Sequence, residues 1–395
     1  MKEKAWIASL LKKTKRIFTR KVVSPAVYGF SSLKPLDEHK VVFVEGCTKE
    51  LSSNFAAIYA KLAENGSYRL RVFCLNKKAM GNRYRGEVLR FLRDAATAKY
   101  VFFDDSQDIQ GSMGKRKGQV FVQVWHGAGA FKKFGRSTMD KIFGDSRKDA
   151  DRFPISAQYD LVTVSSEEVK WAYAEALGEK NSAAVQATGL SRTDCFFDPA
   201  YLEKAKRRVF EEVPEASGKK IILYAPTFRG RVAEATAPDR MDIPAFAGAF
   251  RSEYVLLIKQ HPHVRKRPPI PDGCQGFAFD VTDRLSIEEL LCVSDLCISD
   301  YSSLIFEYSL FERPMIFFAY DLSDYEDWRG FYYPYEELTP GPVFRTNEEV
   351  IRYIRNVDRE FDKKTVRAFR EKFMSACDGH ATDRILKLVF QTRRE

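Results

Sequence analysis

The sequence predicts two α/β domains in tandem, each built as a doubly wound open sheet of parallel strands. From Lys40 onward, short apolar runs alternate with amphipathic helical segments, a rhythm typical of parallel sheets. The rhythm pauses at a charged, weakly apolar stretch over residues 201–220 and then restarts. A length of 395 residues also suits two domains of roughly 150 to 200 residues better than one core.

The first half contains apolar runs that are typical of interior strands. Strands are predicted over residues 41–44, 70–75, 100–103, 120–124 and 161–164. Between them, apolar residues recur at the spacing of one helix face, which predicts helices over residues 54–62 and 166–177. Strand and helix therefore alternate, as in a doubly wound sheet.

The second half repeats this pattern after the charged stretch. Strands are predicted over residues 221–224, 254–258, 296–298 and 314–318. Helices are predicted over residues 243–250, 287–293 and 303–311. Two open sheets of this kind bind their ligand beyond the carboxyl ends of the strands, so we expect a ligand cleft between the two domains.

These patterns divide the chain into four parts. We expect a basic amphipathic segment over residues 1–30 and a Rossmann-like domain over residues 31–205. A second Rossmann-like domain is expected over residues 206–375, followed by a C-terminal helix over residues 376–395.

The charge of the chain favours an acidic partner. The 64 Lys and Arg outnumber the 54 Asp and Glu and give a net charge of +10. Nucleic acid, anionic lipid and phosphorylated small substrates all qualify. Nucleic-acid binding is disfavoured, because Phe102, Phe103 and Phe317 lie in strand-like runs and are expected in the core rather than on a surface that stacks bases.

Cysteine usage and hydropathy indicate a chain of the reducing cytoplasm. The seven cysteines are scattered and never form a Cys-x-x-Cys pair, which argues against a disulfide framework and against a zinc site. No run approaches the ~18 apolar residues that a membrane-spanning helix needs. We therefore expect a chain that does not cross a membrane.

The first residues predict a basic amphipathic helix. Apolar side chains share one helical face at Ile7, Leu10, Leu11, Ile17 and Phe18. Basic side chains crowd the rest of the segment at Lys12, Lys13, Lys15, Arg16, Arg20 and Lys21. Such a helix can lie in the headgroup region of an anionic membrane, and the alternative is a helix packed on its own domain with a solvated basic face.

Polar residues with chemical potential follow the strand predicted over residues 120–124. His126 emerges at the carboxyl end of this strand and can gain or lose a proton near neutral pH. Gly127 lets the backbone approach a ligand, and Lys132 and Lys133 add positive charge in the following turn.

Two strands of the second half end in a similar way. Lys259 and His261 follow one of them, and Thr227 and Arg229 follow another. An imidazole that faces a phosphate is favoured over a metal site, since no cluster of Cys or carboxylates near His261 supplies a third ligand. A surface Arg after a proline-stopped strand is the alternative for Arg229.

The run from Ser299 to Ser303 lies between a predicted strand and a predicted helix. Small polar side chains at Ser302 and Ser303 can satisfy the first N–H groups of that helix. The N–H groups and the positive end of the helix dipole converge at this turn, which predicts a phosphate site without a metal. A well-capped structural helix is the alternative.

Six motifs occur in the order found in one known family. They are Trp-His-Gly at 125–127 with a trailing Lys-Lys-x-Gly, Gly-Leu-Ser-Arg-Thr-Asp at 189–194, Tyr-Ala-Pro-Thr-Phe-Arg at 224–229, Lys-Gln-His-Pro at 259–262, Ser-Asp-Tyr-Ser-Ser at 299–303, and Asp-Trp-Arg-Gly-Phe-Tyr at 327–332. In these residues the chain resembles the CDP-glycerol glycerophosphotransferase family of teichoic-acid synthesis. The match runs from about Lys40 to about Arg384.

The resemblance implies a GT-B fold, with an N-terminal domain on the acceptor side and a C-terminal domain that binds a CDP-polyol donor. It also implies transfer of a polyol phosphate to a hydroxyl of a lipid-linked acceptor, with release of CMP. His126 matches the family's candidate base, and His261 matches its second essential His, near the donor phosphates.

The same match assigns the remaining candidates to a side of the cleft. The donor-side residues are Thr227, Arg229, Lys259, Asp300, Ser302, Ser303 and Glu307. The acceptor-side residues are Gly127, Lys132 and Lys133. No metal ligand and no cofactor is expected.

The resemblance also implies the substrates. The donor is CDP-glycerol or CDP-ribitol, with glycerol phosphate as the expected group, and the acceptor is an undecaprenyl-pyrophosphate-linked saccharide at the cytoplasmic face of an anionic membrane. Residues 128–131 read Ala-Gly-Ala-Phe where many members have Thr-Pro-Leu, which leaves the acceptor details open. A primase and a compact polymerase are both open, and a GT-B glycosyltransferase that uses a nucleotide sugar is the alternative enzyme.

Overall fold

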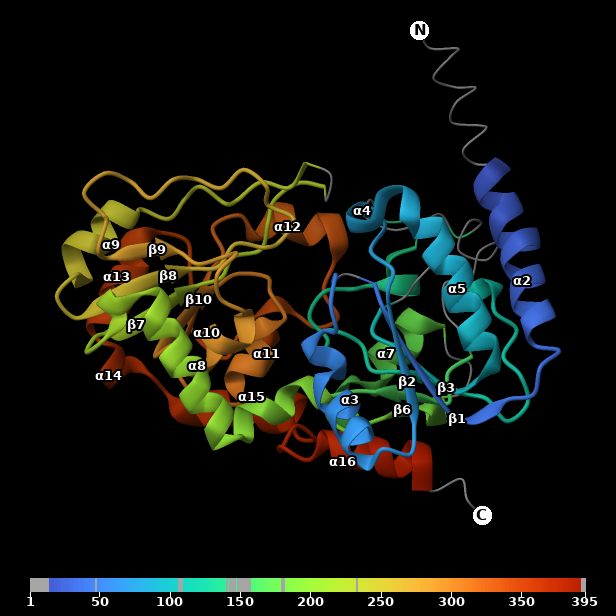
Figure 1. Ribbon diagram of the computed structural model, residues 1–395. Helices are drawn as coiled ribbons and strands as arrows, with labels where there is room; N and C mark the ends of the chain where they lie inside the picture. The colour runs from blue at the N-terminus through green and yellow to red at the C-terminus, as the bar shows by residue number, and fades with distance from the viewer. Residues whose placement is uncertain are drawn as a thin grey trace, which may run out of the picture.

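The computed structural model consists of two α/β domains that lie side by side (Figure 1). It describes residues 14–46, 48–105, 109–139, 141, 147, 158–178, 182–231 and 234–391. Each domain contains a six-stranded sheet in which every neighbouring pair of strands is parallel. The predicted fold class of two doubly wound domains is therefore confirmed.

The N-terminal sheet has the strand order β2-β1-β3-β4-β5-β6. Its strands are β1 (Asp37–Glu45), β2 (Arg69–Cys74), β3 (Ala98–Phe103), β4 (Val120–Gln123), β5 (Leu161–Thr163) and β6 (Val185–Gln186). The chain winds outward in one direction from β1 and in the other from β3. The crevice between the carboxyl ends of these two strands is the switch point at which such sheets bind ligands.

Helices cover both faces of this sheet (Figure 1). They are α2 (Ser24–Ser31), α3 (Ser53–Asn65), α4 (Lys77–Met80), α5 (Tyr84–Thr97) and α7 (Lys170–Leu177). In α3, Phe55, Ile58 and Leu62 recur at helical spacing and are buried, and Phe55 contacts Phe43 of β1 at 5.2 Å between ring centroids. The helix predicted over residues 166–177 instead begins with a 3₁₀ turn over Glu167–Val169.

The C-terminal sheet has the strand order β12-β11-β10-β7-β8-β9, with its switch point between β7 and β10. Its strands are β7 (Lys220–Tyr224), β8 (Tyr254–Ile258), β9 (Ala278–Asp280), β10 (Leu296–Ser299), β11 (Met315–Phe318) and β12 (Val343–Phe344). Its helices are α9 (Ile243–Phe250), α10 (Ile287–Val293), α11 (Leu304–Ser309), α12 (Leu322–Arg329), α13 (Asn347–Arg355), α14 (Val357–Glu360) and α15 (Lys363–Phe373). Helix α11 is thus shorter than the helix predicted over residues 303–311.

The charged stretch between the domains forms helix α8 (Pro199–Glu212). Asp198 caps this helix by accepting a hydrogen bond from the N–H of Ala200. The helix packs against α10, and it is continuous across the boundary predicted between residues 205 and 206. It is weakly apolar because only a narrow stripe at Ala205 and Val209 is buried.

The C-terminal helix α16 (Ala381–Leu386) returns to the N-terminal domain, where Figure 1 shows it below α3. Ile385, Val389 and Phe390 belong to the same buried cluster as Phe43 and Phe102. The chain therefore crosses twice between the domains, and its last described residues complete the core of the first domain. Phe102, Phe103 and Phe317 are fully buried, as predicted, so their rings are not available to stack on bases.

The chain is helical from Thr14 to the end of α2, while residues 1–13, which carry most of the predicted amphipathic helix, lie outside the described residues. One side of the described helix packs on its own domain. Tyr28 Oη donates a hydrogen bond to Gln119 Oε1 at 2.7 Å, and the backbone oxygen of Arg20 accepts one from Ser112 Oγ. Arg20 is buried, so it does not lie on a solvated basic face. The membrane role of this segment stays a prediction.

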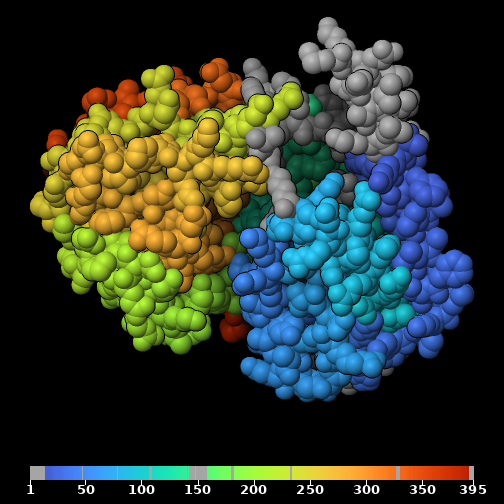
Figure 2. Space-filling model, turned by 45° about the horizontal axis from the view of Figure 1, so that its top comes forward, coloured from blue at the N-terminus to red at the C-terminus, as the bar shows by residue number. Residues whose placement is uncertain are grey.

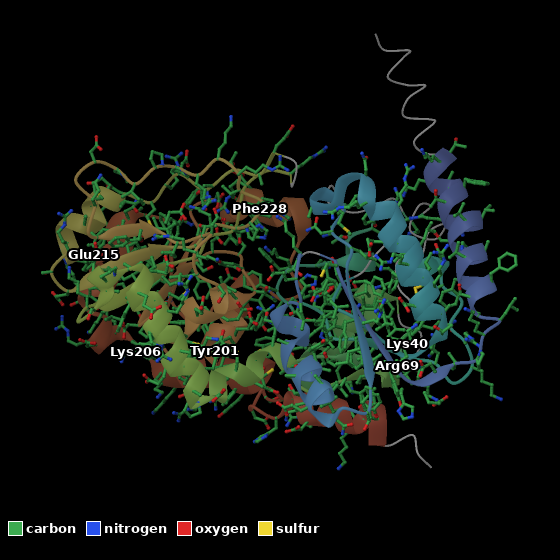
Figure 3. All side chains as sticks on the ribbon, viewed as in Figure 1. Lys40, Arg69, Tyr201, Lys206, Glu215 and Phe228 are labelled. Atoms are coloured by element: carbon green, nitrogen blue, oxygen red, sulfur yellow. The ribbon has the colours of Figure 1, made fainter. Side chains whose placement is uncertain are left out.

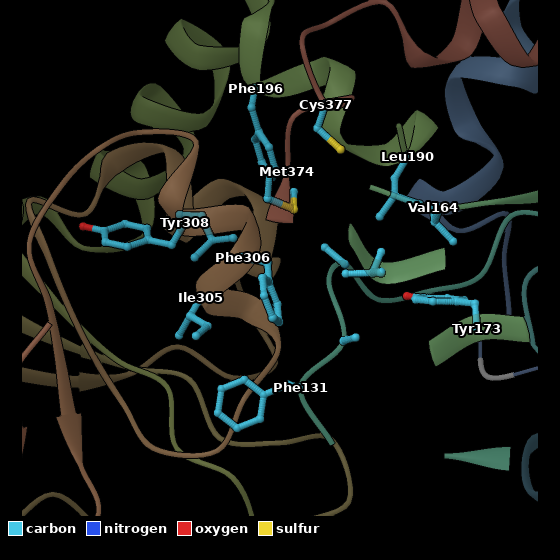
Figure 4. Packing of buried hydrophobic residues seen from close by; sticks show 14 of the residues in the cluster. Phe131, Val164, Tyr173, Leu190, Phe196, Ile305, Phe306, Tyr308, Met374 and Cys377 are labelled. Atoms are coloured by element: carbon cyan, nitrogen blue, oxygen red, sulfur yellow. The ribbon is translucent and has the colours of Figure 1, made fainter. Parts of the chain in front are cut away.

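The two domains share one hydrophobic core (Figure 4). Phe131 of the first domain packs edge-on against Phe306 of α11, with 6.2 Å between ring centroids. Phe306 in turn stacks on Phe369 of α15 at 5.1 Å. Gly129 lies against the same ring, because a Cβ added there would sit 2.4 Å from atoms of Phe306. Close packing of this kind fixes the domains against each other.

We predict that Gly129→Ala destabilises the protein by about 2 to 4 kcal/mol, because Gly129 has a φ of +61° and the buried ring of Phe306 cannot move aside. Thermal unfolding followed by circular dichroism would measure the loss. Gly86→Ala in α5 is the matched control, since nothing lies within 4 Å of its added Cβ, and it should be neutral or slightly stabilising. Equal unfolding temperatures for the two variants would contradict the packing described.

Candidate active site

The candidate residues lie on loops that follow the carboxyl ends of the parallel strands. Residues 124–133 follow β4 in the first domain. In the second domain, residues 225–229 follow β7, residues 259–263 follow β8 and residues 300–303 follow β10. Figure 2 shows a deep cleft between the two domains. The topology thus brings the predicted residues to the edges of the sheets that border this cleft.

His126 is held in one tautomer by the backbone. Its Nδ1 lies 2.8 Å from the carbonyl oxygen of Asp104, which can only accept a hydrogen bond. The neutral ring therefore carries its proton on Nδ1 and keeps a lone pair on Nε2. The side chain is 43% exposed, and the indole of Trp125 stacks on it at 4.5 Å between centroids. This imidazole is placed to accept a proton through Nε2.

The turn that carries His126 is strained and tightly fixed. Trp125 has a φ of +57°, and its N–H donates to Gln123 Oε1 at 3.0 Å. Tyr173 Oη donates to the carbonyl oxygens of Gly127 at 2.9 Å and Gly129 at 3.0 Å. Across the domain junction, a Cβ added at Gly127 would lie 3.7 Å from Ser303 Oγ. The histidine turn of the first domain therefore abuts the serine turn of the second.

A buried arginine joins the same turn to both domains. Arg192 donates hydrogen bonds to the carbonyl oxygen of His126 at 2.9 Å and to Asn54 Oδ1 at 3.2 Å in the first domain. It also donates to Glu288 Oε1 at 2.9 Å and forms an ion pair with Glu307 Oε1 at 2.8 Å in the second. Its side chain is only 12% exposed. We call Asn54, Arg192, Glu288 and Glu307 the junction cluster.

The two acids of the junction cluster have different pKa shifts. Burial raises the pKa of Glu307, although the Arg192 guanidinium opposes that shift. Burial also opposes ionisation of Glu288, but Arg192 and the hydroxyl of Ser53 outweigh it and lower the pKa of Glu288. Ser53 donates to Glu288 across the junction at 2.7 Å. Glu307, which was predicted on the nucleotide side, forms its ion pair with Arg192 inside the domain junction.

A second pair of buried acids lies at the switch point of the first sheet. Glu45 ends β1, and Asp104 follows β3. Asp104 accepts hydrogen bonds from the N–H of Gly46 at 3.2 Å and from Asn54 Nδ2 at 3.3 Å. Burial and a hydrogen bond with the Glu45 carboxyl raise the pKa of Asp104 to about 9. The carboxyl group of Asp104 therefore holds a proton at neutral pH. The backbone carbonyl oxygen of the same residue is the group that orients His126.

Arg229 and Asp300 are bound to each other at the switch point of the second sheet. Arg229 forms a two-pronged contact with Asp321, at 2.6 and 2.9 Å, and donates to Asp300 Oδ2 at 2.9 Å. Asp300 Oδ1 also accepts from the N–H groups of Thr227 at 2.8 Å and Tyr301 at 2.6 Å. The charge of Arg229 is thus offset by two carboxylates, and the cluster fixes the shape of two cleft loops.

Thr227 and Lys259, also predicted on the donor side, are turned inward. The side chain of Thr227 is buried, and among the described residues its hydroxyl has no hydrogen-bond partner. Lys259 Nζ donates to the carbonyl oxygens of Thr282, at 2.7 Å, and Leu285. Burial lowers the pKa of Lys259.

His261 has the opposite tautomer preference to His126. Its Nδ1 accepts a hydrogen bond from the backbone N–H of His263 at 3.1 Å, so the neutral ring carries its proton on Nε2. The ring of Phe228 packs on it at 4.8 Å between centroids. Phe228 lies in the upper part of the C-terminal domain in Figure 3. His261 is thus prepared to donate a hydrogen bond, whereas His126 is prepared to accept a proton.

The serine turn is more open than a capped helix start. Ser302 Oγ accepts only a long hydrogen bond, 3.4 Å, from the N–H of Leu304. The hydroxyl of Ser303 does not cap α11, contrary to the expectation that it would satisfy the helix N–H groups. Both residues are partly exposed. The hydroxyl of Ser303 therefore lies at the junction with Gly127, whereas that of Ser302 keeps one long contact with the first turn of α11.

The two acceptor-side lysines lie where the first domain meets the loop after α12. The N–H of Lys133 donates to the carbonyl oxygen of Gly330 at 3.0 Å, and Lys132 pairs with Phe331 in an isolated antiparallel bridge. Lys132 Nζ also donates to Tyr325 Oη at 3.3 Å. These contacts tie the loop after β4 to the second domain a second time.

Sequence reasoning did not identify the junction cluster or the Glu45–Asp104 pair. Arg192 stands within the motif at residues 189–194, but a motif does not reveal which carboxylates meet a buried guanidinium. Asn54, Arg192 and Glu288 are far apart in the chain and come together only through the fold. Among the described residues, no group of three or more His, Cys, Asp or Glu side chains is arranged to hold a metal ion.

The described parts of the chain also bear on the membrane and cysteine expectations. Within them, no helix is both long and apolar enough to cross a membrane. The six described cysteines form no disulfide, and they are Cys74, Cys195, Cys274, Cys292, Cys297 and Cys377.

We predict that Asp104→Asn flattens the dependence of stability on pH. The folded protein keeps a proton on Asp104 up to about pH 9, whereas the unfolded chain releases it near pH 4. The free energy of unfolding therefore decreases as pH rises between these values, by at most ~1.4 kcal/mol per pH unit. The unfolding temperature of Asp104→Asn should fall less between pH 6 and pH 8.5 than that of the wild type.

Asp358→Asn is the matched control, because it removes an exposed carboxylate from α14 and leaves the buried pair intact. Its unfolding temperature should follow the wild-type curve. Parallel curves for Asp104→Asn and the wild type would show that Asp104 is ionised in the folded protein.

Comparison with known proteins identifies the family. Residues 26–391 match the model of the family described as CDP-Glycerol:Poly(glycerophosphate) glycerophosphotransferase. The chain is 33% identical to the teichoic acid ribitol-phosphate primase of Bacillus spizizenii, over 91% of this chain and 92% of that protein. It is 35% identical to the teichoic acid poly(ribitol-phosphate) polymerase of the same organism, over 93% of this chain, but it spans only 59% of that relative's length.

Glycerol-phosphate enzymes are also related. The teichoic acid glycerol-phosphate primase of Bacillus subtilis is 29% identical, over 74% of this chain and 73% of that protein. A solved structure of the wall teichoic acid polymerase TagF aligns with a TM-score of 0.78 at 22% identity, over 98% of both chains, which shows a shared fold. The predicted GT-B arrangement of two doubly wound domains around a cleft is thus the arrangement of a known wall teichoic acid enzyme. The chain belongs to the CDP-glycerol:poly(glycerophosphate) glycerophosphotransferase family.

Proposed function

We propose that the protein transfers a polyol phosphate from a CDP-activated donor to a hydroxyl of a lipid-linked acceptor and releases CMP. The observation that carries this proposal is the position of His126, whose Nε2 lone pair is free of the backbone contact and whose turn abuts Ser303 of the opposite domain. Family membership supports the reaction class. The reaction attacks phosphorus and makes a phosphodiester linkage.

In the proposed step, Nε2 of His126 takes the proton of the acceptor hydroxyl. The hydroxyl oxygen forms a bond to the polyol-bearing phosphorus, and the bond from that phosphorus to the CMP oxygen breaks in line with it. CMP leaves with the electron pair of the broken bond. The resulting imidazolium is stabilised by the carbonyl oxygen of Asp104, which accepts the Nδ1–H at 2.8 Å.

The developing charge on the donor phosphates needs hydrogen-bond donors. His261 fits this role, because its Nε2 carries a proton while Nδ1 accepts from His263. Ser302 and Ser303 supply hydroxyl groups on the same domain. Four other donor-side residues shape the loops of the cleft, because their polar groups are already engaged or buried. They are Thr227, Arg229, Lys259 and Asp300. Glu307 acts through Arg192.

The polyol in the transferred group has two candidates, glycerol and ribitol. The sequence resemblance led us to expect glycerol phosphate, and that expectation stays a prediction. Ribitol-phosphate enzymes are 33 to 35% identical to this chain, whereas glycerol-phosphate enzymes are 27 to 31% identical. Transfer of ribitol phosphate from CDP-ribitol is therefore the favoured form of the reaction.

The acceptor in this proposal is an undecaprenyl-pyrophosphate-linked saccharide, with Gly127, Lys132 and Lys133 on its side of the cleft. A lipid-linked acceptor requires contact with a membrane. The described part of the N-terminal helix and the turn after it expose Phe18, Val22, Phe30 and Leu33, with exposed fractions of 56, 50, 76 and 82%. Exposed apolar side chains beside basic ones support peripheral attachment to the cytoplasmic face of an anionic membrane.

The test of the reaction is CMP release from CDP-ribitol and from CDP-glycerol, each with and without a short-chain lipid-pyrophosphate saccharide or a polyol-phosphate-primed acceptor. Acceptor-dependent CMP from one donor names the reaction and the polyol together. No CMP from either donor, with folded protein, would reject the proposed reaction.

We predict that the two histidines respond differently to replacement by Gln, whose amide places an N–H near the position of Nε2. His126→Ala and His126→Gln should both lower kcat by about 10²- to 10⁴-fold, because neither side chain can act as a base. His261→Ala should lower kcat by about 10²- to 10³-fold, and His261→Gln should recover part of that loss by restoring a donor.

His39→Ala is the matched control, since His39 is an exposed histidine at the start of β1 and should leave CMP release unchanged. Near-normal turnover of His126→Ala would exclude His126 as the base. Equal losses for His261→Gln and His261→Ala would exclude a simple hydrogen-bond donor at that position.

A further inference from the structure

A cavity of about 450 Å³ lies between the C-terminal part of α2 and helix α5, within the ~300–1,000 Å³ of ligand pockets. Figure 1 shows these two helices side by side at the outer edge of the N-terminal domain, with α2 outermost. The lining residues are Phe30, Ser31, Lys34, Lys40, Arg90, Arg93, Asp94 and Thr97. The side chains of this lining carry a net charge of +3.

The positive charge is concentrated at the mouth of the cavity. Lys34, Arg90 and Arg93 are all exposed. Arg90 pairs with Glu87 one helical turn away, but exposed pairs of this kind contribute little and leave the guanidinium accessible. Three cationic side chains on two neighbouring elements thus surround one opening.

The only carboxylate of the lining is already neutralised. Asp94 forms an ion pair with Lys40, and Arg71 approaches its other oxygen at 3.6 Å. Lys40 also donates a hydrogen bond to Thr97 Oγ1 at 3.0 Å. Lys40 appears beside the lower end of α5 in Figure 3. Asp94 therefore builds the wall of the cavity and does not oppose an anion at its mouth.

Exposed apolar side chains stand at the rim of the same cavity. Phe30 lines it and is 76% exposed, and Leu33, three residues later, is 82% exposed. Phe18 and Val22 continue the exposed apolar surface toward the start of the helix. A basic cavity edged by exposed apolar groups matches an anionic phospholipid, whose phosphate lies next to its acyl chains.

The cavity is separate from the catalytic loops. Lys40 is the first residue of β1 in register with β2, and Thr97 immediately precedes β3, so the cavity lies at the amino ends of these strands. Asp104 and the His126 turn lie at the carboxyl ends. A phosphate bound here is therefore not the donor phosphate under attack.

We propose that this cavity binds the phosphate of an anionic phospholipid headgroup through Lys34, Arg90 and Arg93, while Phe30 and Leu33 enter the acyl region of the bilayer. The inference rests on the proposed peripheral attachment of the enzyme to an anionic membrane. It makes attachment selective for lipid charge and sets the orientation of the N-terminal domain on the membrane.

The experiment measures full-length protein on vesicles of phosphatidylcholine alone and of phosphatidylcholine with phosphatidylglycerol, by sedimentation. The double variant Arg90→Gln/Arg93→Gln should bind the anionic vesicles about thirtyfold more weakly than the wild type. The matched control Arg352→Gln/Arg355→Gln removes the same charge from exposed positions on α13 of the other domain and should bind as the wild type does. Binding of the two double variants within twofold of each other would overturn the proposal.

A second measurement separates a built site from a diffuse surface charge. Calorimetric titration with dihexanoylphosphatidylglycerol below its micelle concentration should give saturable binding to the wild type and the α13 control, and none to Arg90→Gln/Arg93→Gln. Absence of saturable binding to the wild type would overturn the headgroup site even if vesicle binding were weakened.

CMP release with a water-soluble acceptor keeps this proposal distinct from the proposed reaction. Arg90→Gln/Arg93→Gln should retain wild-type turnover in that assay, since the cavity is remote from His126. Lost lipid binding with normal turnover supports both proposals. If the double variant loses lipid binding but the wild type releases no CMP, the headgroup site is supported and the proposed reaction is rejected. If the double variant binds lipid as the wild type does and turnover is normal, the proposed reaction is supported and the headgroup site is rejected.

Discussion

The buried guanidinium of Arg192 is the contact on which the arrangement of the two domains depends. Burying an arginine is costly unless its charge and its N–H groups are all compensated. Here Asn54 and the carbonyl oxygen of His126 compensate it from one domain, and Glu288 and Glu307 do so from the other. These contacts are made together only when the domains meet as they do in this structure, and Glu307 offsets the charge of Arg192 as an ion pair without a hydrogen bond to its Nε.

The same contact couples the chemistry to the domain junction. Arg192 holds the backbone of His126 from one side, and Asp104 orients its imidazole from the other. The turn also carries a strained residue, Trp125. At position 129 the backbone of the turn lies so close to Phe306 that only glycine fits. Strain and close packing persist only where the surrounding structure enforces them, so the site is organised before any substrate binds.

Much of the fold could be predicted because its strands and helices follow local patterns. The strand predicted over residues 254–258 and the helix predicted over residues 243–250 match β8 and α9 in full. The charged stretch over residues 201–220 was harder to interpret, because α8 buries only one narrow stripe and its composition resembles a linker. His126 was predicted at a strand end, and the structure places its turn next to Ser303.

The rest of the site depends on contacts between distant parts of the chain. Nothing near Arg229 in the sequence indicates that its guanidinium donates to both carboxylate oxygens of Asp321. The donor-side role expected for Arg229 stays a prediction. Glu307 was expected on the nucleotide side, which stays a prediction, and the sequence did not indicate its ion pair with Arg192, more than one hundred residues earlier. Side-chain pairing across a domain junction is set by the packing of the sheets, which local periodicity does not encode.

The most direct test of the central role of Arg192 is the kcat for CMP release by Arg192→Lys, in protein shown to be folded by near-ultraviolet circular dichroism. Lysine keeps the positive charge, but its single nitrogen cannot reach the His126 carbonyl oxygen and both glutamates in the geometry that the guanidinium allows. We expect kcat to fall about ten- to hundredfold while the KM for the CDP donor changes little, because the histidine turn would shift relative to the serine turn. A kcat within twofold of the wild type would contradict the account.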